Sequence, residues 1–292
     1  MGGRWILAGV VEIPQTVGEL MVAVMLGRVV AGDVVRPAHV GAVTARDLTL
    51  IRSAGSYFWL VLSGFAEPLL YLLAVGWGVG SLVGAIPLED GRSISYQAFI
   101  APALLATSAM NGALAEATIN FFAKLRYLKH YDSVLNTPVT PAEVAFGELM
   151  WATIRGALYS GAFLLVMIMM GLVTPWAALA AFPAALLICL AFSAVGLAMS
   201  TFMRDWSDFE YSGVVQFALF VFSGTFVPLS VFPEPARILV ELTPLYHGVE
   251  LTRAMTLGPL DSTSLVNLLY LLVLMVAATA VAARRMRRRL RR

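Results

Sequence analysis

The chain has 292 residues, of which 59% are hydrophobic and 13% charged, and its mean hydropathy is +0.81. A soluble domain of this length needs about a quarter of its residues charged to cover its surface, so the composition excludes a soluble enzyme and indicates a membrane protein. The net charge of +2 is misleadingly small, because seven of the last nine residues are arginine. A single cysteine, Cys189, excludes an intrachain disulfide.

The first 55 residues contain no run that is long and apolar enough to cross a membrane, because Glu19, Arg28 and Asp33 interrupt the one candidate. No removable signal peptide is evident, so we expect this part to be retained. Residues 44–55 place Leu48 and Ile51 near one helical face, which predicts a short amphipathic helix in the membrane interface. A solvated linker is the alternative.

Six later stretches have the length and apolar composition of membrane-spanning helices. They cover residues 57–82, 96–122, 144–173, 177–202, 209–229 and 265–283. The sequence therefore predicts an all-α polytopic membrane protein with six transmembrane helices. We divide it into a cytoplasmic N-terminal segment (1–43), a transmembrane domain (44–283) and a basic cytoplasmic tail (284–292).

The basic residues predict the orientation of these spans. With six spans both termini lie on one side, and that side carries sixteen of the twenty lysines and arginines, whereas the opposite side carries three. Because basic residues concentrate in cytoplasmic loops, we expect both termini in the cytoplasm and the protein in the cytoplasmic membrane. The arginine-rich tail also suits contact with anionic headgroups of membrane lipids.

Two loops have the composition of short helices. Residues 123–143 combine basic and aromatic residues at helical spacing, which predicts a short helix exposed to the cytosol; a basic loop that only fixes the topology is the alternative. Thr140, Pro141 and Glu143 then form a helix start signal. Residues 230–264 contain two amphipathic pieces broken by prolines, which predict two short helices at the outer surface, either a re-entrant pair or a surface cap.

Four ionisable residues fall within the predicted spans: Glu67, Glu116, Glu148 and Arg155. Charges at membrane depth mark either function or internal pairing. Glu148 and Arg155 lie seven residues apart, about 10.5 Å along a helix, so each is expected to pair with another helix. Internal salt bridges are the main interpretation, and a proton relay through Glu67, the deepest of the four, is the alternative.

The sequence lacks the motifs that would indicate a metal site or an ATP-binding site. The three histidines are widely separated, so no metal site is expected. The sequence has no G-x-x-x-x-G-K-[ST], so it binds no ATP through a P-loop, and ATP and Mg²⁺ would have to be held by a partner. No enzymatic activity, no directly bound cofactor and no nucleic-acid partner are expected.

Three stretches resemble the ABC-2 type permeases, most closely the branch of nodulation-factor and lipooligosaccharide exporters. They are residues 116–156 (EATINFFAKLRYLKHYDSVLNTPVTPAEVAFGELMWATIRG), 222–233 (FSGTFVPLSVFP) and 242–258 (LTPLYHGVELTRAMTLG). The resemblance implies a permease that pairs with a second copy or a related permease and docks two copies of a cytoplasmic ABC ATPase. It implies a coupling helix between the second and third spans and an N-terminal interface helix. The implied docking residues are Lys129, His130, Tyr131, Asp132, Ser133, Val134 and Leu135 in the first helix, and Arg46, Asp47 and Arg52 in the second.

An ATP-driven exporter subunit is therefore the leading hypothesis, with a lipid-linked, glycolipid or amphiphilic, drug-like cargo. The candidate lining of its path is aromatic, namely Phe65, Tyr71, Trp77, Phe217, Phe220 and Phe222, although such residues also pack helices together or face lipid. A proton-driven secondary carrier that uses Glu67 is the first alternative. A membrane-embedded enzyme acting on lipid, with Glu241 or Glu250 beside His247 and with Asp261 nearby, is the second.

Overall fold

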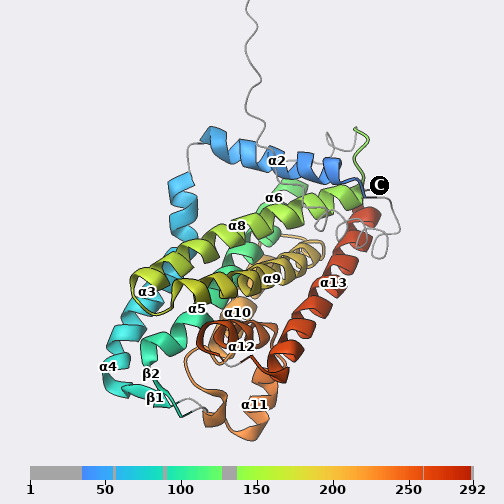
Figure 1. Ribbon diagram of the computed structural model, residues 1–292. Helices are drawn as coiled ribbons and strands as arrows, with labels where there is room; N and C mark the ends of the chain where they lie inside the picture. Colours follow the sequence, from blue (N-terminus) through green and yellow to red (C-terminus); the bar gives the residue numbers. More distant parts are fainter. Residues whose placement is uncertain (1–34, 55–56, 88–90, 127–136, 259, 291–292) are drawn as a thin grey trace, which may run out of the picture.

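A computed structural model describes residues 35–54, 57–87, 91–126, 137–258 and 260–290, and this part of the chain is almost entirely helical (Figure 1). The elements in chain order are α2 (Pro37–Ala54), α3 (Tyr57–Gly78), α4 (Gly80–Val83), β1 (Ala85–Pro87), β2 (Ser93–Ser95), α5 (Tyr96–Ala115), η1 (Glu116–Asn120), α6 (Phe121–Arg126), α8 (Pro141–Met169), α9 (Pro175–Ser200), α10 (Asp208–Val221), η2 (Leu229–Val231), α11 (Glu234–Glu241), α12 (Pro244–Leu257) and α13 (Ser262–Leu290).

Four helical stretches are long and apolar enough to cross a membrane: Tyr96–Arg126, Pro141–Met169, Pro175–Ser200 and Ser262–Arg288. Four of the six predicted spans are thus confirmed by length and composition. The predicted first span is helical as α3 followed by α4, and the described apolar part of this stretch, Pro68–Val83, is shorter.

The predicted span over residues 209–229 is wrong in extent. Helix α10 has only 14 residues and ends at Val221, because Phe222 leaves the helical conformation and Gly224 has a positive φ of 71°. A left-handed residue at this position favours glycine and stops the helix. The chain then continues through η2 into the short helices α11 and α12, of 8 and 14 residues.

The all-α prediction needs a small correction. Strands β1 and β2 pair antiparallel, with Ala85 opposite Ser95 and Pro87 opposite Ser93. These two strands and α11 lie at one end of the bundle, whereas α2 and the C-terminal end of α13 lie at the other (Figure 1). The two ends of the bundle therefore differ in structure.

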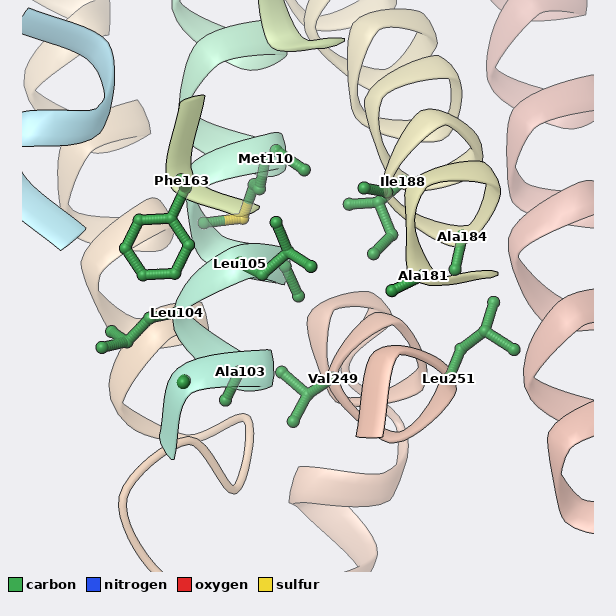
Figure 2. Packing of buried hydrophobic residues seen from close by; sticks show 14 of the residues in the cluster. Ala103, Leu104, Leu105, Met110, Phe163, Ala181, Ala184, Ile188, Val249 and Leu251 are labelled. Carbon is green, nitrogen blue, oxygen red and sulfur yellow. The ribbon is translucent and has the colours of Figure 1, made fainter. Parts of the chain in front are cut away.

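Helix α5 lies at the centre of the bundle. In the stretch Tyr96–Arg126, 83% of the most apolar 18-residue segment is buried. The corresponding fraction is 28% in Ser262–Arg288, which lies at the edge of the bundle. Side chains of α5 such as Leu105 and Met110 pack with Ile188 of α9 and Val249 of α12 (Figure 2). A helix that is apolar on all sides is expected at such a central position.

Small residues let the central helices approach closely. A Cβ atom on Gly112 of α5 would lie 2.4 Å from a ring carbon of Tyr159 in α8, and one on Gly156 would lie 2.7 Å from the Cys189 sulfur in α9. Small residues at contacts are typical of membrane helices, where packing rather than water exclusion drives association. These contacts fix α5, α8 and α9 as the frame that carries the site described next.

Candidate functional site

Helix α2 packs on the first turns of α8 through one continuous face. Val40, Val43, Thr44 and Asp47 are buried at helical spacing, and the Thr44 hydroxyl donates a hydrogen bond to the Gly147 carbonyl at 3.1 Å. A Cβ atom on Gly147 would lie 2.6 Å from Val43, so only glycine allows this approach without a shift. The helix is thus held against the bundle by shape as well as by hydrogen bonds.

This packing corrects the sequence prediction for the N-terminal helix. The helix begins at Pro37 rather than at residue 44. Its buried face lies on the Val40 and Asp47 side, and Leu48, predicted on the apolar face, is only half-buried. The difference arises because the partner surface belongs to α8, which the periodicity of α2 alone does not identify.

A buried carboxylate joins the start of α2 to the start of α8. Glu143 and Thr140 form a capping box, in which the Glu143 carboxylate accepts from the Thr140 N–H at 2.7 Å, so the predicted helix start is confirmed. The same carboxylate accepts from the Arg36 N–H at 2.8 Å, and the His39 Nδ1 atom lies 3.0 Å away. Glu143 is 1% exposed, so the capping group also fixes where α2 begins.

Lys124 of α6 lies at the centre of a charge network that joins three helices. Its Nζ atom is 2.8 Å from a carboxylate oxygen of Glu148 in α8, 3.0 Å from Asp47 in α2 and 3.5 Å from Glu116 in η1. All three acids are at most 3% exposed. Arg46 lies at the rim, 3.5 Å from Asp47. A buried carboxylate is strongly destabilising without a partner, so this one lysine holds all three helices in register.

Glu116 extends the network deeper into the bundle. Its carboxylate pairs with Arg155, accepts a hydrogen bond from the Trp151 indole N–H at 2.9 Å, and accepts another from the Asn120 amide. The Arg155 Nε atom in turn donates to the Tyr159 hydroxyl at 2.9 Å. Glu148 and Arg155 thus both pair with groups on another helix, as their spacing indicated.

The backbone is irregular where this network begins. Residues Glu116–Asn120 form a π-helical turn between α5 and α6. Such turns are rare, occur mostly as single bulges inside α-helices and are frequent at functional sites. This turn lies directly beside the ion pair of Glu116 with Arg155, so the rotation of α6 relative to α5 is set at the point where the charges meet.

The predicted docking residues lie only partly within the described structure. Lys129, His130, Tyr131, Asp132, Ser133, Val134 and Leu135 lie outside the described residues, as does the side chain of Arg52. Helix α6 ends at Arg126 just before this segment, and α8 begins at Pro141 after it. Asp47 is buried against Lys124 rather than available to a partner, whereas the Arg46 side chain is 27% exposed.

A second polar cluster closes the opposite end of the bundle around Arg253 of α12. Its guanidinium donates to the Gly224 carbonyl at 2.8 Å and the Thr225 carbonyl at 3.3 Å, pairs with Glu250 at 2.9 Å, and stacks 4.0 Å from the centre of the Phe99 ring. Arg253 therefore fastens the turn after α10 to α12 and α5. Both outer motifs noted in the sequence contribute to this contact.

The candidate path-lining aromatics separate into two groups. Tyr71 and Phe220 pack together with Phe226, with ring centres 5.1 to 6.2 Å apart. Trp77, Phe217 and Phe222 lie on the outside of the single chain, each more than half exposed. The side chains of Phe65 and Glu67 lie outside the described part of α3.

The side chains considered for an enzymatic site are each bound to a different neighbour. The His247 Nδ1 atom lies 2.7 Å from the Asn267 amide oxygen and its ring stacks on Tyr270, while Glu250 pairs with Arg253. Glu241 lies 4.0 Å from Arg237, and Asp261 accepts a hydrogen bond from the Ser264 N–H. Among the described residues, no group of three His, Cys, Asp or Glu side chains is arranged to hold a metal ion.

Comparison with known proteins decides between the classes. A family profile described as ABC-2 type transporter matches residues 39–257, which include all but the first two residues of α2, the charge network and the Arg253 cluster. The chain belongs to the ABC-2 type transporter family. Within that family it is a permease of the Nodulation protein J branch.

The relatives of this ABC-2 permease cover most of its length. It is similar to Nodulation protein J of Rhizobium meliloti (strain 1021), with 30% identity over 68% of this chain and 74% of the relative. Nodulation protein J of Sinorhizobium fredii is 32% identical over 66% of this chain and 72% of its own. Nodulation protein J of Azorhizobium caulinodans is 27% identical over 72% of this chain and 83% of its own.

Sequence reasoning did not single out Lys124, Trp151 and Arg253 of this permease as site residues. One signal was present, because Glu116, Asn120 and Lys124 recur every four residues and so share a helical face. The partners of Arg253 are backbone carbonyls, which carry no side-chain signature in a sequence.

Proposed function

We propose that this ABC-2 permease is the membrane-spanning subunit of an ATP-driven exporter in the cytoplasmic membrane. The observation that carries the proposal is the buried network around Lys124. The segment over residues 127–136 connects α6, which carries Lys124, to α8, which carries Glu148. A force applied to that segment from outside acts at once on both helices of the network. This is the mechanical connection that a permease without its own motor requires.

The energy comes from a separate ATPase. ATP and Mg²⁺ are bound by two copies of that partner, and two permease copies, or one copy with a related permease, enclose the path. The partner docks on residues 129–135 and on the exposed side of α2, including Arg46. The end of the bundle that carries α2 and the C-terminal arginines faces the cytoplasm, because basic residues concentrate on that side.

The cargo is lipid-linked, a glycolipid or an amphiphilic, drug-like molecule. Its path is apolar, and the Tyr71, Phe220 and Phe226 cluster lies at the outer end of α10. Trp77 and Phe217 are exposed on the single chain and face the second permease or lipid. An apolar, aromatic path favours such a cargo over a free ion, which needs polar groups in place of its water shell.

Co-purification with an ATPase tests the proposal. The tagged permease is expressed with a candidate ATPase, and both retention of the ATPase and ATP-dependent export into inverted vesicles are measured. We expect Tyr131→Ala and Asp132→Ala to reduce both, and Arg237→Ala, on exposed α11, to reduce neither. Export that stops with an uncoupler and with Glu67→Gln, but continues without ATP, would instead establish the proton-driven carrier.

A further inference from the structure

The last turns of α13 are held in a fixed orientation. The Arg285 guanidinium donates to the Thr201 hydroxyl at 3.1 Å and to the Thr201 carbonyl at 3.3 Å, and it stacks 3.6 Å from the centre of the Phe202 ring. Ala282 and Met286 on the same side of α13 are buried. The end of α13 is thus anchored to the end of α9, and the direction of its other side chains follows from this anchor.

The opposite side of α13 is an exposed apolar stripe that ends in two arginines. Val266, Leu269, Val273 and Val281 are exposed and lie on one helical face. Continuing that face by steps of three and four residues leads to Arg284 and Arg288, which are also exposed. The stripe therefore changes from apolar to cationic within one helical turn, at the same end of the bundle as α2 (Figure 1).

We propose that this face of α13 binds an anionic phospholipid of the inner leaflet. The acyl chains lie along the Val266 to Val281 stripe, and the phosphate sits between Arg284 and Arg288. The two guanidinium groups are one turn apart, about 6 Å along the axis, and each presents a planar pair of donors that matches phosphate oxygens. A zwitterionic lipid carries a compensating ammonium group, so net negative charge determines which lipid is retained.

The lipid site rests on the proposed function in one respect only, namely that the C-terminal end of α13 faces the cytoplasm. An acidic surface of the ATPase is the competing occupant of the same arginines. The two arginines continue the apolar stripe, and this favours lipid, because a soluble ATPase cannot contact a helix face that lies within the membrane. Arg285 is not part of the site, since its guanidinium is engaged with Thr201 and Phe202.

The test uses the full permease with its ATPase in nanodiscs of phosphatidylcholine containing phosphatidylglycerol, with native mass spectrometry to count retained lipid. Each arginine near an anionic surface contributes about 1 kcal/mol, which is roughly a fivefold change in affinity. We therefore expect Arg284→Gln and Arg288→Gln each to weaken phosphatidylglycerol retention about fivefold, and the double variant about 25-fold. Arg237→Gln on α11 removes one exposed arginine elsewhere and should leave retention unchanged.

Unchanged retention in the double variant, or an equal loss in Arg237→Gln, would overturn the lipid site. Loss of the ATPase with unchanged lipid would also overturn it, since the arginines would then serve the protein partner. Failure of the unmodified permease to retain any ATPase would count against the proposed function instead, and the lipid measurement would still stand by itself.

Discussion

Replacing Lys124 by methionine should destabilise the inner end of the bundle more than any exposed substitution. The ammonium group lies 2.8, 3.0 and 3.5 Å from carboxylates of Glu148, Asp47 and Glu116. Glu116 keeps its pairing with Arg155, and Asp47 keeps only the longer contact of 3.5 Å with Arg46, so the loss falls mainly on Glu148 and Asp47. Removing one member of a buried ion pair costs about 3–5 kcal/mol, because the remaining charge stays in a poorly solvated place.

The free energy of unfolding can be followed by titrating the detergent-solubilised permease with a denaturing detergent and measuring helix content. Arg126→Gln is the matched control, because Arg126 is an exposed basic residue of the same short helix and should change the free energy by less than about 0.5 kcal/mol. Lys124→Met with Glu148→Gln removes both charges of the shortest pair, so it should be more stable than the sum of the two single variants predicts.

Strictly additive losses in that double variant would refute the reasoning, as would a Lys124→Met variant with the unfolding midpoint of the unmodified chain. The same double variant also tests the transmission of force. If Lys124 connects α6 to α8, the partner ATPase should still hydrolyse ATP in the double variant while the amount of cargo moved per ATP falls.

Three further predictions concern single contacts. Gly147→Ala should cost about 1–3 kcal/mol and expose α2 to protease, because its Cβ atom would lie 2.6 Å from both the Cβ and the Cγ1 atoms of Val43. Gly41→Ala is the control, since a Cβ atom on Gly41 of α2 meets nothing within 4 Å and should leave the cleavage unchanged. Arg253→Lys should speed hydrogen exchange over residues 222–228, because a lysine ammonium group lacks the planar guanidinium that donates to the Gly224 and Thr225 carbonyls. The loss of one such charged hydrogen bond costs about 1.5–3 kcal/mol of stability. Arg237→Lys on exposed α11 is the control and should not change the exchange rate. The hydrogen bond from the Ser264 N–H lowers the pKa of Asp261, so the ionised carboxylate stabilises the start of α13 at neutral pH and this stabilisation is lost as the pH falls below about 4. Amide hydrogen exchange in the first turn of α13 should accelerate in that range. Asp261→Asn should remove this pH dependence.

The parts of this fold that the sequence predicts well are those specified by local chemistry. Thr140 and Glu143 cap α8 because a capping box needs only residues three apart. Four spans are recognisable because their apolar stretches exceed the thickness of a bilayer. The strands Ala85–Pro87 and Ser93–Ser95 are missed, since three-residue strands are too short for a periodic pattern.

The parts that the sequence does not predict depend on contacts between distant residues. Lys124 and Asp47 are 77 positions apart, and neither residue indicates which helix it will meet. The early end of α10 has a similar cause, because Arg253 binds the carbonyls of Gly224 and Thr225 and so stabilises a turn in place of a longer helix. Buried charges at membrane depth could be recognised as important, but their partners had to come from the structure.

The contacts at the two ends of α2 show how an ionic network would suit the proposed function, in which α2 moves as a unit. At its first turn α2 is tied to α8 through Glu143, and further along it is tied to α6 through Asp47 and Lys124. An apolar contact of the same size could slide by small steps, whereas charge pairs buried away from water have only a few arrangements in which every group is satisfied. Under the proposed function, we therefore expect a force on residues 127–136 either to leave the whole network in place or to move α2, α6 and α8 together into a second paired arrangement. If α6 moves as the proposed function requires, the π-helical turn at Glu116–Asn120 is where the change would be absorbed, because it separates α6 from the tightly packed α5.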